Sequence, residues 1–477
     1  MGVLLIRIGP MLAALLGAIA LAGPARAQTP DAACTSASPS SAVCTGADKL
    51  AEAAAAECRR VGLPDSDCAL PLGRQVSNAI VQGYAKTWLH RTAAFQYGLG
   101  VGLPLLRAQW LGTHNSFNTV SDQATLSHTD SNQQLTLSQQ LDIDVRALEL
   151  DVHWLPSVNA GGANAVVVCH GRGPDQQDFG CTNERLFSQV LPEVANWLNA
   201  HRGEVVLLYL EDELGDPAGY AETVRVLDKV LKRPDGSSLI YRPTNSEMTA
   251  KGCANLPLGI SRDDVRRRGA RVVLVGNCRS GWASDVYGWD DVHVESGSTP
   301  RYRPFPSCDA TYPRDVYDTK LVRYYEDSTF VSSAIDPSKS PKAAAAEMLS
   351  PDKASAMTRC GVNLFGFDQL LPDDGRIAAS IWSWGKDKPS AADGRCAVQR
   401  PSGRWMTRPC LKRRQAACRI GGVLKVTHNA FTHDGAKQAC VQRGGTLGLP
   451  RTGYENSLLR VAAGPTSEVW LGYRLSG

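Results

Sequence analysis

Two histidines and several acidic residues stand at the ends of short apolar runs. The segments that carry them are Gly-Thr-His114-Asn115-Ser, Ala-Leu-Glu149-Leu-Asp151, Val-Cys-His170-Gly and Leu-Tyr-Leu-Glu211. Side chains at the carboxyl ends of parallel strands meet in one pocket, so this placement predicts a shared site. Imidazoles suit acid–base chemistry near neutral pH, and an amide with three carboxylates suits a hard cation such as calcium. Together these residues predict metal-assisted chemistry at a phosphate group.

Strand-like and helix-like segments alternate from about Gln109 to Pro372 and would position these side chains. Apolar patterning predicts strands at Ala108–Leu111, Ile143–His153, Ala165–Cys169, Val205–Leu210, Arg271–Val275 and Leu364–Phe367, and helices at Phe187–Ala200 and Tyr220–Leu231. Such alternation over roughly 250 residues is typical of a (β/α) barrel. The fold class expected is therefore α/β, with a distorted TIM barrel at its centre.

The N-terminal residues predict export. Arg7 opens a short positive region, Met11 to Ala22 is apolar but too short to span a bilayer, and Ala25-Arg26-Ala27 is a small-x-small cleavage site. These features predict a signal peptide over residues 1–27, cleaved after Ala27, and a secreted or periplasmic protein.

All fourteen cysteines follow the predicted cleavage site. An even number of cysteines in an exported protein predicts disulfides. Near the mature N-terminus their spacing lacks the paired knuckles of a zinc site, and three connectivities stay open for these four residues, Cys34, Cys44, Cys58 and Cys68. Helical patterns at Ala47 to Arg60 and at Gln75 to Arg91 complete a predicted disulfide-stapled helical segment over residues 28–92.

The overall charge is small. The formal net charge of +4 falls to about +2 without the signal peptide, because Arg7 and Arg26 leave with it. A charge of this size gives no argument for nucleic acid as a partner or for strong electrostatic binding to an anionic membrane.

The motifs around the two histidines resemble the catalytic X-region of phosphatidylinositol-specific phospholipase C. The resemblance rests on the four segments quoted above, extended to Arg146-Ala-Leu-Glu149, in order between Trp110 and Asp212, and it continues more faintly to Leu371. It implies a distorted TIM barrel over residues 93–380. It also implies cleavage of phosphatidylinositol-type lipids at a membrane surface, in which the inositol 2-hydroxyl attacks phosphorus to give diacylglycerol and a cyclic inositol phosphate.

The resemblance also assigns roles to individual residues. Calcium-dependent members of that family use an asparagine beside the first histidine, both acids of a Glu-x-Asp motif and a glutamate ending the next strand. The matching residues here are Asn115, Glu149, Asp151 and Glu211, so Ca²⁺ is the implied cofactor. His114 is implied as the base or transition-state stabiliser, and His170 as its acid partner.

Three further residues are candidate substrate contacts. Arg146 fits a phosphate contact and a structural ion pair equally well, while Arg323 and Tyr325 match, by resemblance, an Arg-x-Tyr pair that holds the inositol ring. The lysines with which animal enzymes recognise phosphorylated inositides have no counterpart near Val275, which argues against a strong demand for 4- and 5-phosphates. Other polar residues are expected to be structural or solvated, namely His128, His153, His201, Asp212 and Glu213.

Residues 381–477 resemble pieces of a C-type lectin-like domain, a small disulfide module. The stretch from Trp382 to Cys418 is similar to the closing half of that domain, and the stretch from Ala436 to Gly472 to its opening half, so the order is inverted. Either a second module is truncated, which would leave this region incomplete, or the halves associate in an unusual way. The Glu-Pro-Asn sugar motif is absent, and Lys386-Asp387-Lys388-Pro389 stands in its place, but glycans remain a candidate partner of this tail.

Two other functions stay open at this point. A glycerophosphodiesterase or a sphingomyelin-cleaving phospholipase D would also use two histidines and a Glu-x-Asp motif, although His114-Asn115 in place of His-Arg-Gly favours the phospholipase C interpretation. A non-catalytic lectin-like binding protein on an inactive barrel is the third hypothesis, and no residue of the expected catalytic set is missing.

Overall fold

The structure is a computed structural model of the chain. It describes residues 78–119, 131–170, 181–250, 252–278, 280–282, 285–295, 305–308, 316–326 and 349–476. The predicted signal peptide, the four N-terminal cysteines and the helix expected at Ala47 to Arg60 lie outside these residues. In the part of the chain that the structure describes, no helix has the length and apolar character needed to cross a membrane.

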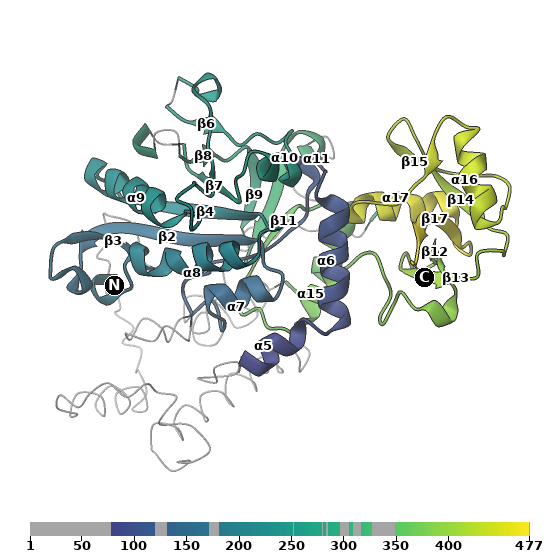
Figure 1. Ribbon diagram of the computed structural model, residues 1–477, viewed down its shortest axis with the longest axis horizontal. Helices are drawn as coiled ribbons and strands as arrows, with labels where there is room; N and C mark the ends of the chain where they lie inside the picture. The colour runs from purple at the N-terminus through teal and green to yellow at the C-terminus, as the bar shows by residue number, and fades with distance from the viewer. Residues whose placement is uncertain are drawn as a thin grey trace, which may run out of the picture. The chain divides into compact units, whose positions relative to one another are not determined.

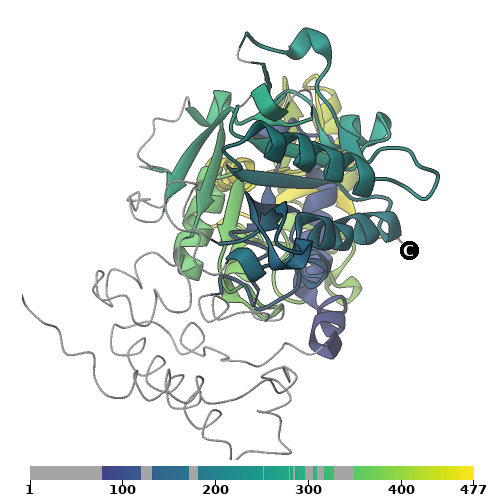
Figure 2. The same ribbon diagram turned by 90° about the vertical axis from the view of Figure 1, so that its left-hand side faces the viewer.

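The barrel-like region is built on one sheet whose strands are almost all parallel. The strand order is β6-β8-β7-β4-β2-β1-β11-β10-β9, with β3 added to β2 and β5 to β7. The direction of the strands turns along this order, so the sheet is curled (Figures 1 and 2). Among the described residues the end strands β6 and β9 do not pair with each other, and the sheet is an open half-barrel.

The elements of this region follow one another as the sequence predicts, with some shifts in their ends. The strands are β1 Trp110–Thr113, β2 Ala147–Pro156, β3 Asn164–Val168, β4 Val206–Glu213, β5 Ile240–Tyr241, β6 Ala254–Asn255, β7 Val272–Gly276, β8 Tyr287–Gly288, β9 Asp291–Glu295, β10 Leu321–Tyr325 and β11 Leu364–Phe367. The helices are α5 Asn78–Tyr84, α6 Trp88–Gly100, α7 Leu137–Asp142, α8 Phe187–Ala200, α9 Pro217–Val230, α10 Arg262–Arg267, α11 Val316–Thr319, α14 Pro351–Cys360 and α15 Gly375–Ser380.

The sheet is buried on both faces, which explains its continuous apolar runs. Along β4, Leu208 and Leu210 join the core that contains α8 and α9, whereas Leu207 and Tyr209 join a second core with Trp110. Side chains alternate between the faces of a strand, so one apolar run supplies both cores. Figure 1 shows α8 and α9 beside β2 and β4.

Two predicted elements differ from the structure. The strand after Ala163 was expected to be parallel, but β3 pairs antiparallel with β2, so His170 follows a hairpin strand. The helix expected over Gln75 to Arg91 is divided into α5 and α6, because Thr87 starts a new helix and its side chain accepts a hydrogen bond from the backbone N–H of His90 (3.2 Å).

The C-terminal region has its own mixed sheet. Its strands are β12 Cys396–Gln399, β13 Trp405–Arg408, β14 Gln415–Ile420, β15 Val423–Val426, β16 Thr446–Leu447 and β17 Val469–Arg474, and its helices are α16 His433–Val441 and α17 Gly453–Ala463. The order β13-β12-β17-β14-β15 places β17, from the second half, between β12 and β14, from the first. The disulfide Cys418–Cys440 also joins the halves, so the two inverted lectin-like pieces associate in one sheet.

The C-terminal sheet packs against the helix α6. The rings of Phe95 and Trp384 lie 5.6 Å apart, and Gln96 Oε1 accepts hydrogen bonds from the backbone N–H groups of Trp382 (2.7 Å) and Ser383 (3.0 Å). The change of composition at Ile381 is therefore followed by a packed contact rather than by a free linker.

Five disulfides form among the described residues. They join Cys169 to Cys181, Cys253 to Cys278, Cys308 to Cys360, Cys396 to Cys410 and Cys418 to Cys440. Disulfides persist in oxidising compartments, so this number fits an extracellular protein.

Candidate active site

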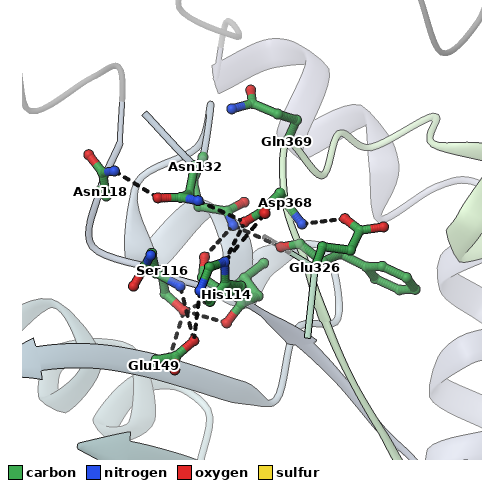
Figure 3. Close-up of polar contacts among 12 residues, drawn as sticks. His114, Ser116, Asn118, Asn132, Glu149, Glu326, Asp368 and Gln369 are labelled. Atoms are coloured by element: carbon green, nitrogen blue, oxygen red, sulfur yellow. Dashed lines mark hydrogen bonds and ion pairs between the residues drawn. The ribbon is translucent and has the colours of Figure 1, made fainter. Parts of the chain in front are cut away.

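The turn after β1 carries the first histidine and asparagine. The backbone N–H of His114 donates to the carbonyl oxygen of Phe367 (3.1 Å), which ties the end of β1 to the end of β11. Asn115 is buried and adopts a positive φ of 42°, an unusual conformation for a residue with a side chain. Its backbone N–H donates to Glu149 Oε2 (3.1 Å), which holds the turn over β2 (Figure 3).

Three carboxylates meet because of the register between β2 and β4. Asp151 lies opposite Glu211, and Glu149 stands two residues before Asp151 on the same face of β2. One oxygen from each of the three groups lies within 4.8 Å of the others. Since Glu149 and Asp151 are 3% and 5% exposed, this acidic cluster concentrates negative charge where water screens it poorly.

Burial and mutual repulsion raise the pKa values of two carboxyl groups in the acidic cluster, Glu149 and Asp151. Burial raises the pKa of Glu149 to about 8, with the Glu211 carboxylate adding to the rise while His114 opposes it. Burial and the carboxylates of Glu211 and Glu149 raise the pKa of Asp151 well above its ordinary value. The cluster therefore favours a proton or a cation among its oxygens.

The side chain of Asn115 completes this set of oxygens. Its amide ends 2.9 and 3.0 Å from the two carboxylate oxygens of Asp151. An amide oxygen does not donate to a carboxylate, so the amide either turns its nitrogen toward Asp151 or shares a cation with it. One amide and three carboxylates form an oxygen-only donor set that fits calcium.

His114 faces this cluster with one ring nitrogen and an aspartate with the other. Its Nδ1 lies 3.1 Å from Asp368 Oδ1, and its Nε2 lies 4.0 Å from Glu149 Oε2. Burial opposes protonation of His114, but the carboxylates of Asp368 and Glu149 outweigh it and raise the pKa well above its ordinary value. The surrounding carboxylates therefore favour the protonated imidazole, whose Nε2 faces the acidic cluster.

Asp368 was not among the residues proposed from the sequence. It follows the buried strand β11 directly, in the segment Phe367-Asp368-Gln369, just as His114 follows β1. That position is the signal that identifies it. Its backbone N–H donates to Glu326 Oε2 (2.7 Å), and Arg376 donates to the same oxygen (2.6 Å), so a buried network fixes Asp368 against His114 (Figure 3).

His170 reaches this network through two asparagines. Its Nδ1 lies 3.5 Å from Asn118 Nδ2, which donates to Asn132 Oδ1 (2.8 Å). Asn132 Nδ2 in turn donates to Asp368 Oδ1 (3.2 Å). His170 itself is exposed, so it lies at the open side of the site whereas His114 lies inside it.

Arg323 and Tyr325 line the interior next to His114. The rings of Tyr325 and His114 are 5.9 Å apart in an edge-on arrangement, and Gly366 leaves room for Tyr325 because a Cβ there would overlap its ring. Arg323 Nε donates to Asp291 (2.5 Å), and its guanidinium lies 4.4 Å from the ring centre of Trp289. Arg323 Nη1 is buried without a hydrogen bond among the described residues, so it retains a donor.

Arg146 lies away from this site, in an ion pair. Its Nε is 2.8 Å from Glu204, and its guanidinium lies 4.6 Å from the ring centre of Trp197. The structure thus supports a structural role for Arg146 and not the alternative role in phosphate binding. His153 lies near the carbonyl of Cys169, and Asp212 accepts from Tyr220, as expected for structural residues.

The chain is similar to several known proteins. The model of the Rv2075c PI-PLC-like domain matches residues 69–374. The uncharacterized protein Rv2075c of Mycobacterium tuberculosis is 51% identical over 478 residues, covering 97% of this chain and 98% of that protein. Bovine tetranectin is 48% identical over 48 residues, 9% of this chain and 24% of tetranectin.

Two solved structures align at lower similarity. The phosphatidylinositol-specific phospholipase C of Listeria monocytogenes has a TM-score of 0.38 and 14% identity, over 61% of this chain and 97% of that one. A calcium-dependent phosphoinositol-specific phospholipase C from Pseudomonas sp. has a TM-score of 0.32 and 16% identity, over 60% and 95% of the two chains.

Proposed function

Since this chain belongs to the Rv2075c PI-PLC-like domain family, we propose that it is an exported, calcium-dependent phosphodiesterase that cleaves phosphatidylinositol-type lipids. The products are diacylglycerol and a cyclic inositol phosphate. Its disulfides and the predicted signal peptide support export.

One observation carries this proposal. The three carboxylates of the acidic cluster meet within 4.8 Å, and the Nε2 of His114 lies 4.0 Å from Glu149. Carboxylates gathered at this distance repel one another and destabilise a fold, so their gathering beside a histidine supports a functional role.

Asn115, Glu149, Asp151 and Glu211 would hold the calcium ion. When bound, the ion would offset charge on the phosphoryl oxygen and lower the pKa of the attacking hydroxyl. Asn115 suits this position because its turn places the amide within 3.0 Å of both Asp151 carboxylate oxygens, where its oxygen would coordinate the ion.

The two histidines have different tasks in the proposed reaction. The oxygen of the inositol 2-hydroxyl forms a bond to phosphorus, and its proton passes to a carboxylate of the acidic cluster. The bond from phosphorus to the glycerol oxygen breaks, and that oxygen gains a proton. Asp368 orients His114 and keeps it charged, which suits stabilisation of the developing charge on the phosphoryl group. His170, at the open side, supplies the proton to the leaving oxygen.

Arg323 and Tyr325 are the proposed contacts to the inositol ring. Tyr325 stands edge-on to His114, and Arg323 has a donor available beside it. Both belong to β10, next to the strand that ends at Asp368, so a ring bound there would lie close to His114.

Hydrolysis of three substrates tests the proposal. The mature protein is incubated with phosphatidylinositol, sphingomyelin and glycerophosphodiesters, with calcium and with a chelator, and the phosphorus products are separated. A cyclic inositol phosphate formed only with calcium is expected. Choline release from sphingomyelin or hydrolysis of glycerophosphodiesters alone would indicate the neighbouring phosphodiesterases, and no turnover on any substrate would favour a binding protein.

A further inference from the structure

The charge of the chain is divided unevenly along its length. Residues 381–477 contain 16 Lys and Arg against 5 Asp and Glu, a formal charge of +11, whereas residues 1–380 contain 35 against 42, a charge of −7. The small total therefore hides a strongly basic C-terminal region. Most of this charge is uncompensated locally, since four acids in the region pair with only six of its basic residues.

Seven of the basic residues are connected around the disulfide Cys396–Cys410, where β12 begins and β13 and β17 end. Cys396 lies opposite Arg408 on β13 and opposite Arg474 on β17, and the disulfide brings the turn after Cys410 to the same place. We name this group the basic edge; its members are Arg395, Arg408, Lys412, Arg413, Arg414, Lys437 and Arg474.

Short contacts hold the remaining members at the basic edge. Arg408 and Arg414 share the carboxylate of Glu468, each at 2.8 Å. Asp434 lies 3.1 Å from Lys437 and 3.9 Å from Arg474. Arg395 donates to the carbonyl of Leu475 (3.1 Å), the residue after Arg474. Glu468 and Asp434 offset two of the seven charges, so about five remain for a partner.

An exposed apolar side chain, Leu411, lies among the residues of the basic edge. Leu411 is 85% exposed, and it stands in the turn Cys410-Leu411-Lys412-Arg413, whose two basic residues are exposed as well. Neither Lys412 nor Arg413 has an ion pair among the described residues. A leucine beside cations at the tip of a turn fits the boundary between lipid headgroups and acyl chains.

We infer that the basic edge docks the protein on anionic lipid bilayers, with Leu411 entering the interface. Basic clusters of this size are attracted to anionic lipid surfaces, and each Lys or Arg adds to the affinity. Single-stranded nucleic acid bases are usually bound by stacking on exposed aromatic rings. The tryptophans of this region are buried at 5% exposure or less, namely Trp382, Trp384, Trp405 and Trp470, which favours a lipid surface over single-stranded nucleic acid.

Vesicle binding of the mature full-length protein tests this inference. Vesicles of phosphatidylcholine alone are compared with vesicles that contain about 30% phosphatidylglycerol, without any inositol lipid and with a chelator present. We expect binding to the anionic vesicles only, weakening as salt is added. Binding requires no turnover, so its outcome is separate from that of the proposed hydrolysis.

Three variants locate the docking surface. The charge reversal Lys412→Glu with Arg413→Glu should weaken vesicle binding at least ~10-fold. The matched control, Lys425→Glu with Arg443→Glu, reverses two exposed residues outside the basic edge and should have the smaller effect. Leu411→Ser should weaken binding about tenfold at every salt concentration, because it removes apolar contact rather than charge. All three residue sets are exposed, so unchanged melting temperatures are expected.

Several results would overturn the inference. Equal binding to neutral and anionic vesicles would remove the electrostatic argument. Equal losses in the two double variants would show that no particular edge is used. Binding to dextran sulfate or to a DNA duplex without binding to anionic vesicles would assign the basic edge to an anionic polymer.

Discussion

The barrel-like sheet has two histidine–aspartate pairs, one before strand β2 begins and one after strands β1 and β11 end, and only the second faces an acidic cluster. Before the strand begins, His90 Nδ1 lies 3.1 Å from Asp144, which also accepts from Tyr84 (2.8 Å). Beyond the other end of the sheet, His114 Nδ1 lies 3.1 Å from Asp368. Both histidines have a raised pKa, through the Asp144 hydrogen bond for His90 and through Asp368 and Glu149 against burial for His114.

The surroundings of the two pairs differ in how charge is balanced. Next to Asp144, Arg146 is paired with Glu204, and opposite charges line a cavity of about 590 Å³. Next to His114, Glu149 and Asp151 face Glu211, so like charges are gathered instead. Opposite charges in contact offset the cost of each other's burial, whereas like charges gathered in a buried place repel one another and suggest a site that binds or reacts.

Alanine substitutions of His114 and His90 should show the largest difference between the two histidine–aspartate pairs. His114→Ala should lower kcat on phosphatidylinositol at least ~10²-fold, because it removes the charged group next to the phosphate site. The control His90→Ala should keep the kcat of the wild type and lower the melting temperature, since Asp144 loses a partner. Similar kcat losses in both variants would contradict the division of roles.

Asp368→Asn should decide between the two roles open to His114. Without the Asp368 carboxylate, the pKa of His114 should fall. If charged His114 stabilises the transition state, the alkaline limb of the pH–rate profile should move to lower pH, with a loss of about tenfold or more in kcat. A shift of the acid limb would instead assign His114 as the base, and an unchanged profile would mean that Asp368 does not act through His114.

Glu149→Gln should weaken calcium binding at least ~10-fold, because calcium affinity depends on the number of charged ligands. The same substitution should raise the melting temperature of the calcium-free protein above pH 8, where Glu149 is ionised and repels the two neighbouring carboxylates. Titration calorimetry and melting curves with chelator measure these effects. A lower melting temperature without calcium would show that Glu149 has a structural role.

Glu204→Gln is the control for Glu149→Gln, because it replaces the glutamate that pairs with Arg146 near the His90–Asp144 pair. It leaves Arg146 buried without its charged partner, so it should cost about 2 kcal/mol of stability. Calcium affinity and kcat should be unchanged, because Glu204 lies away from the acidic cluster. Denaturant titration gives the free energy of unfolding, and an altered calcium affinity would show that the two sites are coupled.

The smallest expected effect is a pH dependence of stability in chelator. The pKa of Glu149 is about 8 in the folded state against 4.5 ordinarily, because burial raises it. The folded state thus binds this proton more tightly, so its stabilising contribution is present below pH 4.5 and is lost as the pH rises through 8. Melting temperatures should decline over this range in the wild type, and less in Glu149→Gln. A parallel decline in both would exclude Glu149 as the cause.

The sequence predicts those parts of the site that depend on local patterning. The helix Phe187–Ala200 and the strand Leu364–Phe367 have the expected ends, and Glu149, Asp151 and Glu211 meet as expected because period-two alternation fixes the face of each strand. These features follow from spacing within one segment or between neighbouring parallel strands.

Contacts between segments that are far apart in the sequence could not be predicted from residue spacing. His114 and Asp368 are separated by 254 residues, and only the parallel pairing of β1 with β11 brings them together. The antiparallel pairing of β3 depends on the hairpin after Pro156. The role of Arg146 depends on Glu204, which lies in the segment before β4. The net charge of the whole chain likewise does not indicate the basic edge, because it does not record where along the chain the charges lie.

The central claim is that the acidic cluster binds the calcium ion on which catalysis depends. Calcium binding and phosphatidylinositol hydrolysis, measured on the same protein at the same free calcium concentrations, test it most directly. We predict that one ion binds and that half-saturation coincides with half-maximal activity, with both shifted together in Glu149→Gln and unchanged in Glu204→Gln. Full activity of the wild type in chelator would contradict the claim. So would a Glu149→Gln variant that is activated at the same calcium concentration as the wild type.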